Sequence, residues 1–199
     1  MADTYLTISA PSEAIFTEKR SKFLAFAYPV ATVEEVKEHV AALSKKYYDA
    51  RHVCYAYMLG PERKEFRAND NGEPSGTAGK PILGQINSLE LTDVLVCVVR
   101  YFGGIKLGTS GLIVAYRQAA RDCLDSAEII QLHQTATIAF SYPYMAMNDV
   151  MRLTKMDGVE MLSSTFDNTC AMTLRVELDR AQTVRTRLAD IDGVTIHES

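Results

Sequence analysis

Apolar and polar positions alternate near the start of the chain in the pattern that predicts short strands. Residues 5–8 and 14–16 have the two-residue period of a β-strand with one buried face, and residues 22–30 predict another strand. Apolar side chains then recur at helical spacing as far as residue 46, and Thr32 precedes Glu35 by three residues, the spacing of a capping box. We therefore expect an amphipathic helix of about four turns after the third strand.

Two further strand patterns stand in the middle of the chain. Residues 52–59 are dense in β-branched and aromatic side chains and end at a Gly-Pro turn. Residues 91–99 predict a strand covered on both faces, which runs through a glycine loop into a helix over residues 110–127. The polar, turn-forming residues 62–84 predict a long loop, and such a loop inside a compact domain usually binds something.

The last third of the chain predicts a second series of strands and helices. A strand at residues 135–141 and a short helix ending near 156–158 precede two strands at 159–166 and 170–178. Asp179 is expected to cap a helix that reaches residue 188, and residues 194–197 form a final strand. This β-α-β-β-α-β order is typical of a ferredoxin-like domain. The sequence thus predicts an α+β protein of two domains, residues 1–132 and residues 135–199.

Composition and charge narrow the class of protein. The 199 residues are 47% hydrophobic and 23% charged, as in a folded soluble protein. A net charge of −4 disfavours nucleic-acid binding through an overall cationic surface, although it is compatible with a local basic patch. No apolar run is long enough to span a membrane and the first ten residues do not resemble a signal peptide, so we expect a cytoplasmic protein without a membrane partner.

The cysteine and histidine positions do not predict a metal site. The four cysteines lie far apart in the sequence, whereas metal and redox sites usually pair cysteines a few residues apart. Buried, reduced thiols are the expected state. His39, His133 and His197 are isolated, and we expect neither a metal nor another cofactor.

Glycine is concentrated in one part of the chain, since eight of the 11 glycines lie between Gly72 and Gly111. The second glycine-rich stretch, residues 103–111, leaves a buried strand and opens a helix, an arrangement that directs free N–H groups at an anion. Lys106 adds a cation there, and Thr109 and Ser110 are expected to cap the helix or bind the anion. Tight packing of the helix on the sheet is an equally good explanation of the glycines.

Reactive side chains also occur in the first glycine-rich stretch. Glu73, Ser75, Thr77 and Lys80 bring a carboxylate, two hydroxyls and an amine together, but no nucleophile motif is present and turn stabilisation is the favoured interpretation for the two hydroxyls. His52 is a further candidate because histidine commonly acts as a general base near neutral pH, although capping or packing is the favoured role here. The candidate binding residues of both stretches and their flanks are Arg51, His52, Glu73, Ser75, Thr77, Lys80, Arg100, Gly103, Gly104, Lys106, Gly108 and Thr109.

Three blocks of this sequence resemble the signature blocks of the YigZ/IMPACT family. They are DARHVCYAY at residues 49–57, DNGEPSGTAGKPIL at residues 70–83 and VVRYFGGIKLGTSGLIVAY at residues 98–116. The resemblance covers nearly the whole chain, and the three blocks together are highly specific. The family's third block usually reads LGTGGL, so that Ser110 stands here in place of a glycine.

The resemblance implies a fold for each domain and a biological setting. The N-terminal domain is expected to be an α/β sandwich similar to the second domain of small-subunit ribosomal protein five. The C-terminal domain is expected to be ferredoxin-like and similar to the last domain of elongation factor G. Both likenesses point toward translation, and eukaryotic relatives regulate translation during amino-acid starvation. Likeness of fold is an analogy and does not by itself establish function.

Three functions are compatible with these residues. The leading hypothesis is a non-catalytic, translation-associated protein that contacts RNA, the ribosome or a translation factor through residues 72–111. The alternative is an enzyme or nucleotide-dependent switch that holds a phosphate-bearing small molecule between the same loops, with Lys80, Arg100 or Lys106 on the phosphate and Glu73 as acid or base. A third hypothesis assigns partner binding to the C-terminal domain alone.

Overall fold

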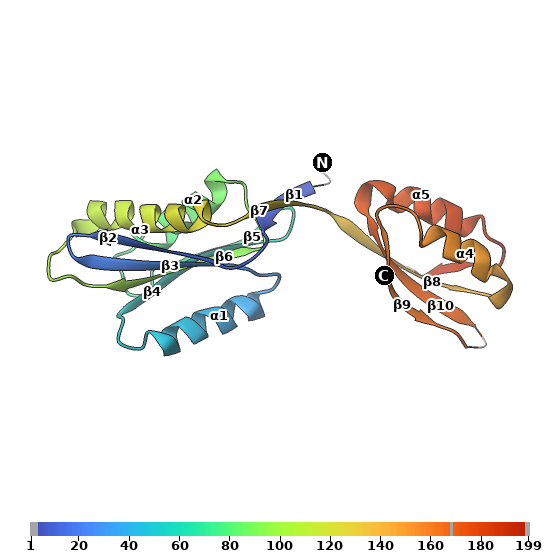
Figure 1. Cartoon of the computed structure of the whole chain (residues 1–199), viewed down its shortest axis with the longest axis horizontal. Helices are drawn as coiled ribbons and strands as arrows, with labels where there is room; N and C mark the ends of the chain where they lie inside the picture. The colour runs from blue at the N-terminus through green and yellow to red at the C-terminus, as the bar shows by residue number, and fades with distance from the viewer. Residues whose placement is uncertain (1–3, 168, 198–199) are drawn as a thin grey trace. The chain divides into compact units, whose positions relative to one another are not determined.

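A computed structural model of the chain describes residues 4–167 and 169–197 and divides it into two compact units (Figure 1). The first unit is Tyr5–Leu132, and the second runs from His133 onward and includes Thr4. Each unit has its own apolar core. The expected α+β class with antiparallel sheets is what the structure contains.

A five-stranded antiparallel sheet forms the centre of the first unit. Its strands, in sheet order, are β2 (Ser12–Glu18), β3 (Ser21–Pro29), β6 (Val94–Tyr101), β4 (His52–Leu59) and β5 (Glu65–Asn69). Strand β6 is central, and its residues 94–99 are all buried, which agrees with the prediction of a strand covered on both faces. A separate two-stranded sheet joins β1 (Thr4–Ile8) to β7 (Ile129–His133), which the sequence pattern did not predict.

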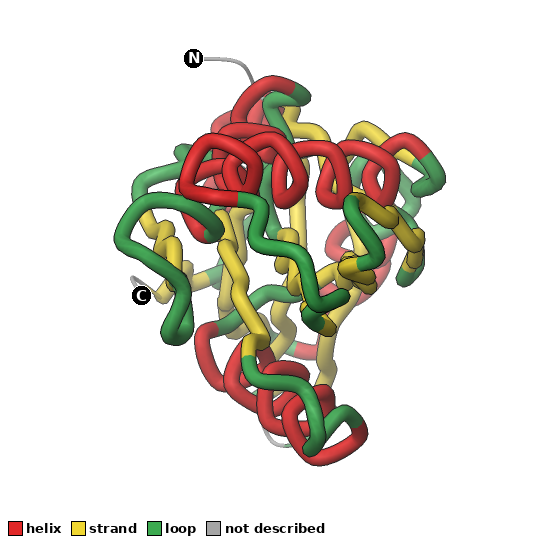
Figure 2. Tube along the Cα trace, turned by 90° about the vertical axis from the view of Figure 1, so that its left-hand side faces the viewer, coloured by secondary structure: helices red, strands yellow, loops and turns green. Residues whose placement is uncertain are grey.

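Helices cover both faces of the five-stranded sheet (Figures 1 and 2). Helix α1 (Val33–Lys46) packs against β4 on one face, while α2 (Gly79–Ser88) and α3 (Gly108–Asp125) lie side by side on the other. The expected cap of α1 is present, because Glu35 donates its backbone N–H to the Thr32 hydroxyl over 3.2 Å. The apolar stripes of these helices thus form two cores, one on each side of the sheet.

The prediction of an unbroken loop over residues 62–84 is wrong. Strand β5 pairs with β4, and α2 begins at Gly79 within the stretch. Asp70 organises the segment between them, because its carboxylate accepts backbone N–H groups from Gly76 at 2.8 Å, Ala78 at 3.1 Å and Gly79 at 2.8 Å. A carboxylate from outside the helix therefore fills the N-terminus of α2.

The second unit contains a four-stranded antiparallel sheet and two α-helices. Its elements are β8 (Thr135–Tyr142), the 3₁₀ turn η1 (Tyr144–Ala146), α4 (Met147–Leu153), β9 (Val159–Thr165), β10 (Cys170–Glu177), α5 (Leu178–Ala189) and β11 (Thr195–His197). The observed element order is the predicted one, and the strands lie in the sheet order β11-β8-β10-β9. The predicted cap of α5 is wrong, because Asp179 lies in the first turn and makes no capping hydrogen bond.

All four cysteines are free and buried, as the sequence predicts. Burial raises the pKa of Cys54 to about 12, so that this thiol stays protonated at neutral pH. Within residues 4–167 and 169–197, no helix is long and apolar enough to cross a membrane.

The cap provided by Asp70 predicts a pH-dependent contribution to stability. Burial acts to raise the pKa of Asp70, but its backbone N–H donors outweigh burial and the pKa lies below its ordinary value. We expect Asp70→Asn to lower the free energy of unfolding by about 1 to 2 kcal/mol at pH 7. Because the folded-state pKa is the lower one, the difference between variant and wild type shrinks as the pH falls through and below about 4.

Urea unfolding at pH 7, 5 and 3 measures this difference. Asp179→Asn is the matched control, since this exposed carboxylate occupies the first turn of α5 without a capping bond and its loss costs only about 0.3 kcal/mol. A deficit of Asp70→Asn that is equal at pH 7 and pH 3 contradicts the role of the charge.

Candidate binding pocket between the glycine loops

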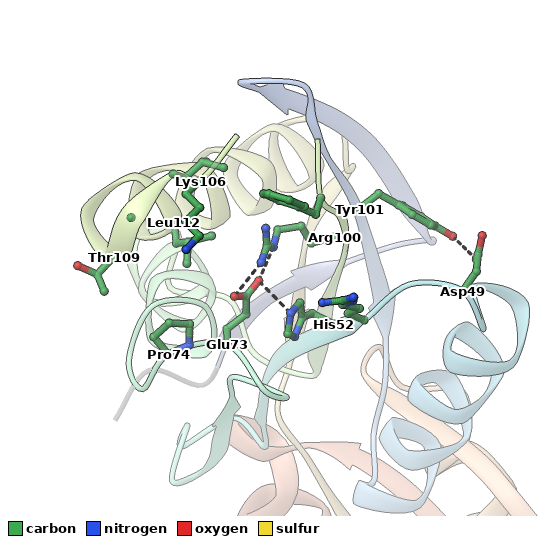
Figure 3. Close-up of a pocket in the computed structure, with 13 residues that line it drawn as sticks. Asp49, His52, Glu73, Pro74, Arg100, Tyr101, Lys106, Thr109 and Leu112 are labelled. Atoms are coloured by element: carbon green, nitrogen blue, oxygen red, sulfur yellow. Dashed lines mark hydrogen bonds and ion pairs between the residues drawn. The ribbon is translucent and has the colours of Figure 1, made fainter. Parts of the chain in front are cut away.

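A cavity of about 760 Å³ lies between the two glycine-rich stretches of the first unit (Figure 3). We call it the loop pocket. Its lining residues are Asp49, Arg51, His52, Glu73, Pro74, Arg100, Tyr101, Phe102, Lys106, Leu107, Gly108, Thr109 and Leu112. They come from the start of β4 and the residues just before it, from the end of β6 and the loop after it, and from the start of α3. Glu73 and Pro74 come from the loop between β5 and α2, residues 70–78, which we call the Asp70 loop. The two glycine-rich stretches therefore meet at one site.

Glu73 lies at the base of the loop pocket with its side chain only 2% exposed. Arg100 donates to both carboxylate oxygens, through Nε to Oε1 and through Nη2 to Oε2 at 3.1 Å. Tyr116 on α3 donates its hydroxyl to Oε1 at 2.7 Å. The buried carboxylate is thus paired with a cation and hydrogen-bonded, as a buried charge requires.

The same network changes the ionisation of its members. Burial acts to lower the pKa of Arg100, but the hydrogen bond and charge of Glu73 outweigh burial and raise it. Burial, together with neighbouring Cys54 and Glu73, raises the pKa of Tyr116 well above its ordinary value. The tyrosine therefore stays a neutral donor and the arginine stays charged.

His52 presents one nitrogen to the loop pocket. Its Nδ1 lies 2.9 Å from the carbonyl oxygen of Asn71, and because a carbonyl only accepts, Nδ1 carries the proton. Its Nε2 lies 3.9 Å from Oε1 of Glu73, as Figure 3 shows. The ring is thereby held in one orientation with Nε2 at the pocket wall, where it can accept a hydrogen bond when neutral or carry positive charge when protonated.

A second polar pair closes another side of the loop pocket. Tyr101 donates its hydroxyl to Asp49 Oδ1 over 2.7 Å, and this hydrogen bond raises the pKa of Tyr101 to about 12 (Figure 3). The tyrosine is neutral at physiological pH and its ring is fixed in place. Asp49 consequently has a hydrogen-bond donor of its own within the pocket wall.

Two cations in the loop pocket remain without such partners. Among the described residues, Arg51 and Lys106 have neither an ion pair nor a hydrogen bond through their side chains. Among the residues that the structure describes, no side chain caps the start of α3, where Leu107 is the N-cap residue. The α2 terminus differs, since Asp70 occupies it. The loop pocket is thus lined by two cations without partners among the described residues and by the start of a helix, both of which favour an anion.

Seven of the predicted site residues line the loop pocket and five do not. Those in the lining are Arg51, His52, Glu73, Arg100, Lys106, Gly108 and Thr109, and those outside it are Ser75, Thr77, Lys80, Gly103 and Gly104. Thr77 is buried and donates its hydroxyl to the carbonyl oxygen of Pro74 at 2.6 Å, which is the turn-stabilising role. Thr109 and Ser110 do not cap α3, which begins at Gly108. Ser110 lines a shallower depression beside Phe16 and Val114.

Gly103 serves packing. A Cβ atom there would lie 2.0 Å from the backbone carbon of Arg20, so only glycine fits without a backbone shift. Its N–H donates to the Ser21 hydroxyl oxygen over 3.1 Å, which joins the loop after β6 to the first residue of β3. Gly108 has a φ of +74° with open space around it, and so serves the backbone conformation at the start of α3.

Sequence reasoning missed six lining residues, namely Asp49, Pro74, Tyr101, Phe102, Leu107 and Leu112, and it missed Tyr116, which binds Glu73 from outside the lining. Tyr101 and Phe102 extend the buried strand pattern and carry no separate signal. Tyr116 is an ordinary core position of an amphipathic helix, and its bond to Glu73 depends on packing between distant segments. In the part of the chain that the structure describes, no group of three or more His, Cys, Asp or Glu side chains could hold a metal ion.

The fold and the loop pocket define an α+β protein with unpaired cations beside a buried ion pair. Residues 19–124, more than half of the chain, match the Impact N-terminal domain family. The chain therefore belongs to the IMPACT family, as its three sequence blocks predicted. It is 39% identical over 142 residues to an IMPACT family member from Thermus thermophilus, a match that covers 71% of this chain and 76% of the relative.

Two further comparisons describe the extent of the similarity. The chain is 37% identical over 131 residues to the IMPACT family member YvyE of Bacillus subtilis, which covers 66% of this chain but only 60% of YvyE. A crystal structure of a hypothetical protein aligns over 100% of this chain and 98% of its own, with a TM-score of 0.79 and 25% identity. The similarity thus reaches beyond the residues of the matched domain.

The pairing of Glu73 with Arg100 predicts a large effect of a small substitution. Glu73→Gln keeps the shape of the side chain but leaves Arg100, whose side chain is 12% exposed, without its counter-charge. We expect the free energy of unfolding to fall by about 3 kcal/mol in chemical denaturation. Glu62→Gln is the matched control, because the Glu62–Lys64 pair is exposed and its loss costs less than about 1 kcal/mol. Equal losses for the two variants contradict a structural role of the buried pair.

Proposed function

We propose that this chain is a non-catalytic, cytoplasmic binding protein of translation that holds a phosphate group of RNA in the loop pocket. The observation that carries the proposal is the pair of unpartnered cations, Arg51 and Lys106, in one cavity with the free N-terminus of α3. Phosphate oxygens are the acceptors that such a combination of charge and N–H groups binds well. Arg100 is not available for this role because Glu73 neutralises it.

Local charge matters here because the whole chain is acidic. A protein of net charge −4 gains little from general attraction to RNA, so a specific site must provide the binding energy. The loop pocket provides it without requiring a basic surface. Few phosphates are bound in this arrangement, and the affinity is expected to depend only moderately on salt.

The assignment to translation comes from the family and its fold. We propose that residues 1–132 form the domain similar to the second domain of small-subunit ribosomal protein five. Residues 135–199 then form the ferredoxin-like domain similar to the last domain of elongation factor G. The element order and the sheet order β11-β8-β10-β9 of the second unit support the ferredoxin-like assignment. A ribosomal protein and an elongation factor both work on the ribosome, which favours RNA over other phosphate carriers.

Charge reversal in the loop pocket tests the proposal. We expect Arg51→Glu and Lys106→Glu each to weaken binding of labelled RNA by about tenfold or more, because each removes a charge-assisted hydrogen bond to phosphate. The slope of log affinity against log salt should fall by about 0.7 for each single-strand phosphate that the variant no longer neutralises. Fluorescence anisotropy measures both quantities, and cosedimentation with ribosomal particles, with and without RNase, locates the RNA in a cell extract.

Lys37→Glu is the matched control for charge reversal. Lys37 is exposed on α1, outside the loop pocket, and its reversal changes the net charge by the same amount. Weakening by all three variants to the same degree shows general electrostatics and contradicts a pocket-specific interaction.

A small phosphate-bearing ligand is the second candidate, favoured by the cavity itself. A volume of about 760 Å³ lies in the ordinary range of small-molecule sites, and His52 Nε2 stands at its wall for acid or base chemistry. Under this alternative, nucleotides or sugar phosphates raise the unfolding temperature saturably, with about 2.7 kcal/mol gained at 100 times the dissociation constant. A thermal-shift screen with and without Mg²⁺ tests this alternative, and the absence of a saturable shift with every compound contradicts it.

A further inference from the structure

The loop pocket has an apolar wall as well as a charged one. Phe102, Tyr101 and Pro74 line it together with Leu107 and Leu112. A phosphate ion alone makes no favourable contact with apolar side chains. A ligand that joins a phosphate to a flat apolar group contacts both parts of the lining. The two kinds of wall therefore restrict the class of ligand.

Phe102 is the unusual member of this wall. Its side chain is 55% exposed, and it belongs to none of the three core clusters among the described residues. Phe102 lies just beyond the end of β6 and lines the loop pocket together with Arg100 and Glu73.

The backbone on either side of Phe102 is fixed. Tyr101 is held through its hydroxyl by Asp49, and Gly103 is held through its N–H by the Ser21 hydroxyl. Phenylalanine itself has only two side-chain torsions, so little conformational entropy is lost when its ring receives a partner. An exposed ring on a fixed backbone is a stacking surface that exists before the ligand arrives.

We propose that the ligand of the loop pocket is a nucleoside phosphate with an unpaired base, whose base stacks on Phe102 while its phosphate lies with Arg51 and Lys106. This inference rests on the proposed function and names the part of the nucleic acid that the pocket takes. The same chemistry is offered by an unpaired nucleotide of RNA and by a free nucleotide. A base inside a duplex is excluded, because both its faces are already covered by neighbouring bases.

Loss of the ring tests the inference. We expect Phe102→Ala to weaken binding of a single-stranded RNA hexamer about tenfold, within the range for removal of one base–aromatic stack. Phe102→Trp should restore or exceed the wild-type affinity, and Phe102→Leu should not. An abasic hexamer with the same ribose-phosphate backbone should bind wild type weakly and be insensitive to Phe102→Ala.

Phe66→Ala is the matched control, since this phenylalanine on β5 is 57% exposed and lies outside the loop pocket. It should leave hexamer binding unchanged. The unfolding temperature of each variant is measured alongside, and an exposed ring should be removable without unfolding the protein. The affinities for adenosine monophosphate and for ribose 5-phosphate are compared to test a free nucleotide as the ligand. If adenosine monophosphate binds more tightly and the hexamer does not bind, the site is assigned to a free nucleotide.

The outcomes separate this inference from the proposed function. Equal binding of abasic and complete hexamers, or an equal effect of Phe102→Ala and Phe66→Ala, overturns stacking, while a loss on Lys106→Glu still upholds phosphate binding. Failure of wild type to bind any of these ligands overturns both. A loss of affinity in Phe102→Ala that is absent in Phe102→Trp, and that occurs only with ligands that carry a base, establishes the nucleotide as the bound group.

Discussion

The buried carboxylate of Glu73 is the constraint on which the loop pocket depends. An unpaired charge at this depth costs several kcal/mol, so the fold must bring Arg100 and Tyr116 to it. These three residues come from the Asp70 loop, the end of β6 and the middle of α3. Their meeting fixes the two glycine-rich stretches against each other. The cavity between them is the consequence of this requirement and is therefore formed before any ligand binds.

This pairing also determines which charges of the pocket are free. Glu73 neutralises Arg100, whereas the partner of Asp49 is the Tyr101 hydroxyl, which is neutral and does not offset the charge of the carboxylate. Arg51 and Lys106 have no partner among the described residues. A locally positive site thus persists in a chain of net charge −4. Such a site selects an anion without making the whole surface attractive to nucleic acid.

The sequence predicts most strands and the helices α1 and α3, because their apolar spacing reflects burial directly. The sequence does not predict helix α2, because Gly79 and Pro81 in its first turn are poor helix formers. It forms because Asp70, nine residues before its first residue, caps it and because its apolar face joins the core. The glycine stretches indicate the site's location. The bond from Tyr116 to Glu73 joins distant segments, and no local pattern encodes it.

Several glycines of the two stretches have structural roles that need no ligand. Gly103 permits close backbone approach to Arg20, and the N–H groups of Gly76 and Gly79 bind the Asp70 carboxylate. Of the two helices that begin in these stretches, α2 is thus capped from within the fold, whereas α3 keeps an uncapped terminus at the cavity. The proposed recognition therefore rests on that terminus and on the side chains around it. These glycines allow the backbone conformation of the two stretches, and that backbone positions Arg51, Lys106 and Phe102.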